Sequence, residues 1–150
     1  MTKIMFVCHG NICRSPMAEM ILKRMVAEKG MEKDFLIASS ATSTEEIWNG
    51  IGNPVYPPAK AELARHGISC EGKRAVQLKR DDYDKYDLFV CMDNKNVRNA
   101  LRIFGSDPEG KVAKLLGDRE VGDPWYTDEF DVTYRDIYEG CIALLEKLES

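Results

Sequence analysis

The reactive groups of this chain are concentrated near its N-terminus, where a cysteine and an arginine share one short stretch of sequence. The stretch reads Cys8-His9-Gly10-Asn11-Ile12-Cys13-Arg14-Ser15-Pro16. A thiolate is a nucleophile, and a guanidinium binds oxyanions through two parallel hydrogen bonds. These two groups on one loop therefore indicate attack on a bound tetrahedral oxyanion, and phosphate is the anion that we expect.

Three local elements must position these side chains. Residues 4–7 form a short apolar run typical of a buried strand, and Gly10 and Asn11 readily adopt positive φ, so the following loop can curl tightly. Ser15 followed by Pro16 predicts a helix start, because serine caps free N–H groups and the fixed φ of proline suits the first helical position. The N-terminus of that helix, with about half a positive charge from its dipole, would then face the loop.

Cys8 is the predicted nucleophile of this loop. It ends the first strand, at the edge of the sheet where ligands bind in open α/β folds. Converging N–H groups and Arg14 favour its thiolate over the neutral thiol. A lone cysteine is more often a small buried hydrophobic residue, but the spacing from Arg14 favours the nucleophile.

This loop resembles the C-x5-R-S phosphate loop of the low-molecular-weight protein tyrosine phosphatases. Two other stretches extend the resemblance over nearly the whole chain, Val90-Cys91-Met92-Asp93 in its middle and Asp123-Pro124-Trp125-Tyr126 near its end. The resemblance implies hydrolysis of a phosphotyrosine-containing protein or a small aryl phosphate through a cysteinyl-phosphate intermediate. Inorganic phosphate would be the product, and the family default is a monomer.

A proton donor is the second requirement, because a phenolate leaves slowly unless it is protonated as its bond breaks. The resemblance assigns this role to Asp123, which precedes Pro124 in a loop, although an Asp-Pro pair is also a common turn signal. After it has given up its proton, Asp123 would activate the water that releases phosphate from Cys8. The flat side chains of Trp125 and Tyr126 are suited to enclose a phenyl ring, and surface packing is their alternative role.

The resemblance also implies supporting roles for polar residues. Asn11 would hold the loop in its curled form with Ser39 as its hydrogen-bond partner, and Ser15 would steady the thiolate in addition to capping its helix. Asp93 would orient the loop arginine as well as capping the helix that follows. Where the family often has a histidine before Ala-Arg-Gln, this chain has Lys73.

Trp48 is the candidate for one wall of the substrate cleft. It lies in a long connection, residues 42–57, that is too broken for a regular element, and long loops in compact domains are usually functional or disordered. The corresponding family loop lines the cleft and contains an aromatic residue. Packing of Trp48 against its own loop is the alternative. The remaining positions of the phosphate loop are His9, Gly10, Ile12 and Cys13.

Cys13 follows Cys8 within the same loop, and a tight curl could bring the two sulfurs within bridging distance. An exposed thiolate is readily oxidised to a sulfenic acid, with which a neighbouring thiol condenses to a disulfide. The resemblance implies such a reversible inactivation. The alternative is that Cys13 packs beneath the loop and is too constrained to reach Cys8.

The composition, with 44% hydrophobic and 31% charged residues, is typical of a globular protein, and we expect one domain over residues 1–150. An odd number of cysteines, five, and the lack of a signal-peptide pattern favour the reducing cytoplasm. No apolar run reaches about 20 residues, so we expect no membrane partner. A net charge of −4 argues against nucleic acid. Neither histidine has a metal-ligand neighbour at a usable spacing, and we predict no metal and no cofactor.

Strands and helices alternate along the chain, which predicts an α/β fold. Predicted strands cover residues 4–7, 35–41, 87–92 and 112–116. Predicted helices cover residues 17–29, 58–66, 78–83, 94–104 and 132–148, and residues 117–131 form a loop. The first helix places Met17, Ile21 and Met25 on one face, which indicates core packing. The alternation predicts a four-stranded parallel sheet with helices on both faces. The resemblance implies the strand order 2-1-3-4, which places the phosphate loop at the switch point.

Three other functions fit parts of the pattern. An arsenate reductase with this loop and fold needs two further cysteines near each other in a mobile segment, whereas Cys91 lies in an apolar strand and Cys70 stands well before it. A phosphoarginine phosphatase of the same family has a smaller, polar β-branched residue where Ile12 stands. A module that only binds phosphotyrosine would need no complete catalytic set, yet Cys8 and Asp123 are both present.

Overall fold

Four parallel strands form the sheet at the centre of the computed structural model, which describes residues 1–149. The strands are β1 (Thr2–Cys8), β2 (Phe35–Ala41), β5 (Leu88–Cys91) and β6 (Val112–Lys114). Their spatial order in the sheet is β2-β1-β5-β6. With the four strands numbered along the chain this is the order 2-1-3-4, as predicted. The first strand is therefore central, and the loop that follows it opens at the switch point of the sheet.

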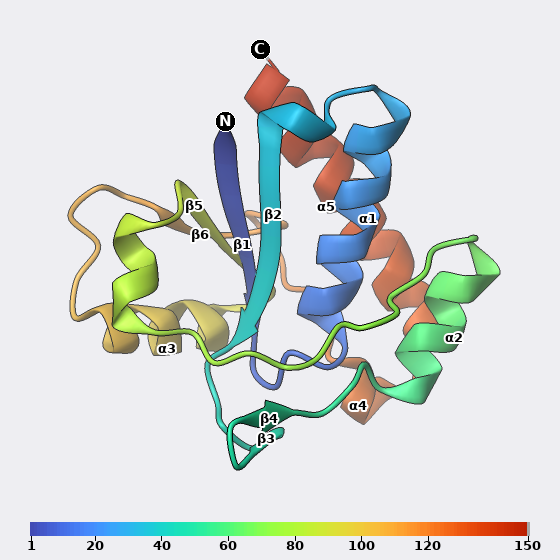
Figure 1. The fold of residues 1–150 in the computed structure, drawn as a ribbon, viewed down its shortest axis with the longest axis horizontal. Helices are drawn as coiled ribbons and strands as arrows, with labels where there is room; N and C mark the ends of the chain where they lie inside the picture. The colour runs from blue at the N-terminus through green and yellow to red at the C-terminus, as the bar shows by residue number, and fades with distance from the viewer. Residues whose placement is uncertain (150) are drawn as a thin grey trace.

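Helices cover both faces of the sheet. They are α1 (Arg14–Glu28), α2 (Pro57–Arg65), α3 (Asn94–Phe104), α4 (Pro124–Thr127) and α5 (Phe130–Glu149), with 3-10 turns at Glu32–Asp34 and Arg80–Asp84. In Figure 1, α1 and α5 lie on one side of the sheet and α3 lies on the other. The predicted α/β class with helices on both faces is confirmed. Within residues 1–149 we find no helix with the length and apolarity that a bilayer span requires.

Two apolar clusters fill the space on the two sides of β1. Ile4 and Phe6 belong to the cluster under α1 and α5, whereas Met5 and Val7 belong to the cluster under α3. This alternation follows from the period of two residues in a strand. Cys8 falls on the same side as Phe6, so its sulfur points toward α1.

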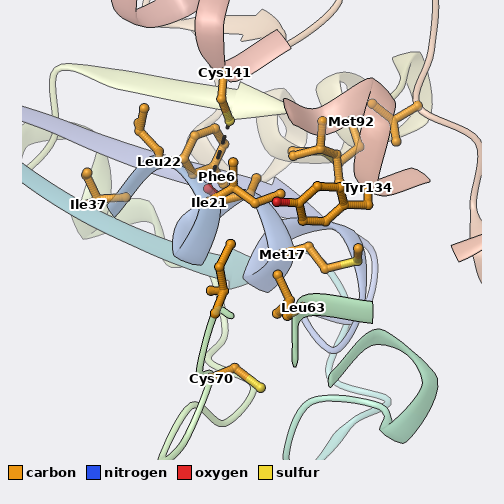
Figure 2. Close-up of a cluster of buried hydrophobic side chains, with 14 of the residues drawn as sticks. Phe6, Met17, Ile21, Leu22, Ile37, Leu63, Cys70, Met92, Tyr134 and Cys141 are labelled. Atoms are coloured by element: carbon orange, nitrogen blue, oxygen red, sulfur yellow. Dashed lines mark hydrogen bonds between the residues drawn. The ribbon is translucent and has the colours of Figure 1, made fainter. Parts of the chain in front are cut away.

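The predicted methionine stripe of the first helix packs into the larger cluster. Met17, Ile21 and Met25 are all buried. Figure 2 shows Met17 and Ile21 gathered with Phe6 from β1 and Tyr134 from α5. Full burial of a side chain of this size stabilises the fold by about 1.5–3 kcal/mol, so this face fixes α1 against the sheet.

Residues 42–57 contain a regular element that the sequence analysis missed. A small antiparallel hairpin pairs β3 (Ile47–Trp48) with β4 (Ile51–Gly52). Its turn consists of Asn49 and Gly50, which both have positive φ, 51° and 76°. Asn-Gly between two strands is the strongest short-range hairpin signal, so the sequence did contain the information.

The type of element differs from prediction in two further segments. Residues 117–131 are not wholly a loop, because Pro124–Thr127 forms the single turn α4 and α5 already begins at Phe130. Residues 78–83 were predicted as a short helix, and only Arg80–Asp84 adopts a 3-10 turn. The helix predicted over residues 94–104 has the correct end, since Gly105, with a φ of 84°, follows the last residue of α3.

Candidate active site

Cys8 lies at the C-terminal end of β1, where the chain leaves the sheet and curls over the start of α1. It is only 3% exposed. The backbone N–H of Asn11 donates to its sulfur at 3.3 Å, and the Ser15 hydroxyl oxygen lies 2.9 Å from the sulfur. Donors aimed at a sulfur stabilise its anionic form, so this environment suits a thiolate nucleophile.

The role of Ser15 differs from the predicted helix cap. The helix begins at Arg14, two residues before the predicted start at Pro16, and the cap position is Cys13, which makes no side-chain capping bond. The Ser15 hydroxyl instead accepts a hydrogen bond from Asn11 Nδ2 at 2.7 Å and faces the sulfur of Cys8. Contact with the nucleophile therefore takes the place of capping.

Asn11 holds the loop in its curled form. Its φ is 59°, a left-handed conformation that asparagine tolerates better than most residues. Its side-chain amide donates to Ser15 and, at 2.9 Å, to the hydroxyl of Ser39 on β2, while its Oδ1 accepts from the Val76 N–H at 3.0 Å. The amide of Asn11 is thus fully engaged, and it ties the loop to two other parts of the fold.

The loop turns its carbonyl groups outward. Those of Cys8, His9 and Ile12 accept hydrogen bonds from backbone N–H groups outside the loop, at 2.9–3.0 Å. Because a trans peptide directs its N–H opposite to its C=O, the N–H groups of the next residues, His9, Gly10 and Cys13, turn to the inside of the curl. Convergent N–H groups at the start of a helix form an anion cradle.

The lack of a side chain at Gly10 allows Glu46 to lie close to the loop backbone. A Cβ atom at this position would lie 3.2 Å from Glu46 Cγ, which is tighter than usual contact distances. The neighbouring His9 places its Nε2 3.0 Å from Glu45 Oε2. Both acidic residues therefore lie at the rim of the phosphate loop.

Arg14 lies beneath the loop with 3% of its side chain exposed. Its Nη1 donates to Asp93 Oδ2 at 2.8 Å and to the Val121 carbonyl at 3.0 Å. Burial alone lowers the pKa of Arg14, but Cys8, Asp93 and Asp123 outweigh burial and raise the pKa above its usual value. The guanidinium is thus a permanent cation that these contacts hold in one orientation. Its remaining N–H groups can donate to an anion in the loop.

Asp93 has two partners. One carboxylate oxygen faces Arg14, and the other accepts from the Asn96 N–H at 2.7 Å, which caps α3. The structure thus contains both contacts that the sequence analysis considered for this residue. Because the helix cap holds Asp93 in place, Asp93 in turn holds the arginine.

Asp123 approaches the loop from the other side of the site. It caps the single turn α4 by accepting from the Trp125 N–H at 3.1 Å, and its Oδ2 lies 3.5 Å from Arg14 Nη2. Its side chain is 29% exposed. A carboxyl group at this position can exchange protons with both a bound oxyanion and solvent water.

A cavity of about 300 Å³ opens above the phosphate loop. Asp123, Trp125 and Tyr126 border it together with the loop, and the two aromatic residues are 55% and 84% exposed. The ring of Trp125 packs against that of Tyr56 at a centroid distance of 4.9 Å. The aromatic pair predicted from sequence thus stands at the mouth of the cavity.

The structure adds residues that the sequence analysis did not single out. Glu45, Glu46 and Lys95 line the cavity, and Tyr56 supports its aromatic wall. None of the four belongs to a motif that indicates chemistry. The only sequence signal was the position of Glu45, Glu46 and Tyr56 in the long connection, residues 42–57, that was expected to be functional.

The prediction that Trp48 forms a wall of the cleft is wrong. Trp48 is 79% exposed, and the described residues that line the cavity do not include it. The hairpin is the physical reason, because it pairs Trp48 with Ile51 and leaves both side chains in solvent. Glu45 and Glu46, just before the hairpin, face the cavity instead.

Cys13 borders the same cavity as Cys8 but has a different environment. It is 6% exposed, and burial, followed by the nearby charge of Cys8, raises the pKa of Cys13 to about 12. Its thiol is therefore protonated near neutral pH. Both cysteines are free in the structure.

The chain was then compared with known proteins. A sequence model of the low molecular weight phosphotyrosine protein phosphatases matches residues 3–150. The chain is 35% identical over 155 residues to the low molecular weight protein-tyrosine-phosphatase YfkJ of Bacillus subtilis (strain 168), with 99% of this chain and 97% of the relative covered. It is 36% identical over 154 residues to the low molecular weight phosphotyrosine protein phosphatase of Gallus gallus, with 96% and 94% covered.

A solved structure extends the comparison to the fold. The crystal structure of SP-PTP, a low molecular weight protein tyrosine phosphatase from Streptococcus pyogenes, superposes with a TM-score of 0.90. The two chains are 34% identical, and the alignment covers 100% of this chain and 95% of that one. The similarity in fold therefore extends over nearly the whole of both chains.

Proposed function

This chain belongs to the low molecular weight phosphotyrosine protein phosphatases, and from that premise we propose how its own residues hydrolyse phosphotyrosine. Cys8 is the nucleophile, Arg14 and the loop N–H groups bind the phosphoryl oxygens, and Asp123 is the general acid and base. The observation that supports this assignment is the approach of Asp123 Oδ2 to within 3.5 Å of Arg14 Nη2 at the border of one cavity with Cys8. The proposed nucleophile, cation and proton donor thus surround a single space.

In the first step the Cys8 sulfur attacks phosphorus in line with the leaving oxygen. An S–P bond forms as the P–O bond breaks, and the electron pair of that bond passes to the phenolic oxygen. Asp123 gives its proton to this oxygen as charge develops on it. Arg14 and the inward N–H groups stabilise the three equatorial oxygens of the transition state.

In the second step Asp123 acts as a base. It takes a proton from a water molecule whose oxygen attacks phosphorus, and the S–P bond breaks with its electron pair returning to Cys8. Inorganic phosphate leaves, and both residues are restored to their starting protonation states. The 29% exposure of Asp123 supports this step because water can reach the carboxylate.

The substrate class follows from the walls of the cavity. Ile12, Trp125 and Tyr126 present apolar and aromatic surface beside the phosphate loop. An aryl ring fits such walls better than a charged guanidinium does, so we propose phosphotyrosine-containing proteins or small aryl phosphates as substrates. We also propose that the enzyme acts as a monomer, which is the family default. We propose the cytoplasm as its location, because its five cysteines are all free thiols.

A specificity panel tests the substrate class. We expect turnover of a phosphotyrosine peptide to exceed that of phosphoserine and phosphoarginine peptides of the same sequence by roughly a hundredfold or more. Greater turnover of the phosphoarginine peptide would contradict the proposed class.

A Cys8→Ser variant tests the nucleophile. It should bind inorganic phosphate but show neither a burst of phenol nor steady turnover, because an alcohol in this loop is a far weaker nucleophile than a thiolate. Turnover retained by this variant would contradict the assignment of Cys8.

The proximity of a second thiol supports a proposal on regulation. Oxidation of Cys8 by peroxide gives a sulfenic acid, and the Cys13 thiol condenses with it to a disulfide with loss of water. Both cysteines border the cavity that peroxide would enter. We propose that this disulfide protects the nucleophile from irreversible oxidation.

A further inference from the structure

Two charged residues at the cavity have no part in the proposed reaction. Glu46 and Lys95 both line the cavity above the phosphate loop. Glu46 is half-buried in the segment between β2 and β3, and Lys95 is exposed on the first turn of α3. The phosphate group of a substrate would occupy the loop and its ring the cavity, so the neighbouring residues of a peptide would pass along the rim.

The carboxylate of Glu46 has no cationic partner within residues 1–149. Its Oε2 accepts from the neutral amide Nδ2 of Asn53 at 2.9 Å, and its own carbonyl accepts from the Asn53 N–H at 2.8 Å. These two bonds hold the residue in place, and Oε1 remains available as an acceptor. Because Glu46 is half-buried, water screens its charge less than that of a fully exposed residue.

The ammonium of Lys95 makes neither a hydrogen bond nor an ion pair with any other residue that the structure describes. The backbone around it is well held, since the Asn94 N–H donates to Glu120 Oε2 at 2.7 Å. A cation in the first turn of a helix is unfavourable for the helix dipole, so Lys95 does not stabilise α3. Its charge is therefore free to pair with a carboxylate from a bound molecule.

The two charges reach the phosphate loop from opposite sides. The loop follows β1, and β1 lies between β2 and β5 in the sheet. Glu46 belongs to the segment that leaves β2, which stays beside the loop because the Ser43 N–H donates to the His9 carbonyl at 3.0 Å. Lys95 belongs to the segment that leaves β5. The rim thus carries a negative charge on one flank of the loop and a positive charge on the other.

We propose that Glu46 and Lys95 are specificity-determining residues that select opposite charges on the two sides of phosphotyrosine. Glu46 binds a basic side chain on one side, and Lys95 binds an acidic side chain on the other. The reverse order of charges in a substrate brings like charges together, which weakens its binding. This inference rests on the proposed hydrolysis of phosphotyrosine peptides, and it names the peptides that the enzyme prefers.

Two isomeric phosphopeptides test the inference, one with Lys-pTyr-Asp and the other with Asp-pTyr-Lys between neutral residues. They have the same composition and net charge, so only the order of the charges differs. The readout is the ratio of their kcat/KM values, in which any change to the shared chemistry cancels. We expect the parent to prefer one isomer roughly threefold to tenfold at low salt, as contacts between exposed charges allow. In 1 M NaCl, where the screening length is about 3 Å, the ratio should approach one.

Exchanging the two charges gives the sharpest comparison. The double variant Glu46→Lys with Lys95→Glu keeps the net charge and should prefer the other isomer. The matched control is Glu32→Lys with Lys33→Glu, because both residues are exposed on the 3-10 turn before β2, at the opposite end of the sheet from the cavity. This control should keep the parental ratio.

The parent enzyme must first hydrolyse a small aryl phosphate, since a parent without turnover contradicts the proposed function itself. An active parent with equal kcat/KM values for the two isomers would overturn the inference. A charge-exchanged enzyme with the parental preference would also overturn it, because charges that act only on the phosphate group affect both peptides alike. Should the double variant fail to fold, the exposed substitution Lys95→Glu decides alone: its ratio should fall toward one, and an unchanged ratio overturns the inference.

Discussion

Arg14 Nη2 and Asp123 Oδ2 face each other at 3.5 Å, although 109 positions of sequence separate them. One residue begins α1 and the other caps α4. The contact brings the proposed phosphate ligand and the proposed proton donor to the border of the same cavity.

Loss of the proton donor should depend on the leaving group. We expect Asp123→Asn to lower kcat for a phosphotyrosine peptide by roughly 10²–10³-fold, because phenolate would depart without a proton. For an aryl phosphate with a strongly electron-withdrawing ring, the same substitution should lower kcat much less, since the phenolate of this substrate is a good leaving group. Steady-state kinetics on the two substrates measure the difference, and equal losses on both would argue against a general acid.

Arg14→Lys should not behave as a conservative change. Lysine keeps the charge but cannot donate to Asp93 and a phosphoryl oxygen in fixed directions. We expect kcat to fall roughly 10²–10³-fold, as when a transition-state donor is removed elsewhere. The inhibition constant of inorganic phosphate should also rise. A variant with parental kinetics would mean that a point charge alone is sufficient.

Trp125 and Trp48 should differ in their effects on small substrates. Trp125→Ala removes an aromatic wall of the cavity and should raise KM for an aryl phosphate by up to about tenfold, while leaving hydrolysis of a small alkyl phosphate little changed. Trp48→Ala is the matched control, because this tryptophan is exposed on the hairpin. A rise in KM of the same size in both variants would contradict the assignment of the wall.

Recovery from oxidation should depend on Cys13 and on pH. The parent should be inactivated by peroxide, protected by phosphate and restored by dithiothreitol, whereas Cys13→Ser should lose activity irreversibly. Because burial raises the pKa of Cys13 to about 12, its thiolate fraction increases about tenfold per pH unit below that value. Disulfide closure after a peroxide pulse should therefore accelerate between pH 6 and 9, as followed by mass spectrometry. A Cys13→Ser variant that recovers fully would show that another thiol protects Cys8.

The sequence by itself determined the parts of the site that are close together in the chain. Cys8, Asn11 and Arg14 share one loop between a strand and a helix, and glycine, asparagine and the following helix start already predict its curl. The parallel sheet was predictable too, because strands joined by helices make right-handed parallel crossovers, and its strand order came from the resemblance to the family. These features depend on local conformation and on chain connectivity, which the order of residues specifies.

Only the tertiary structure decided which distant groups meet. Lys73 reaches Glu19 because the segment after α2 runs beside β2, where its ammonium also finds the Ser39 carbonyl. Trp48 points into solvent because a two-residue turn reverses the chain just after it. Ser15 contacts the Cys8 sulfur and does not cap the helix, because α1 begins at Arg14, two residues before the Pro16 start that the cap signal suggests. The contact of Lys73 with Glu19 joins two remote segments, so no short window of sequence contains both partners, whereas the Asn-Gly hairpin and the contact of Ser15 with Cys8 each lie within a short window.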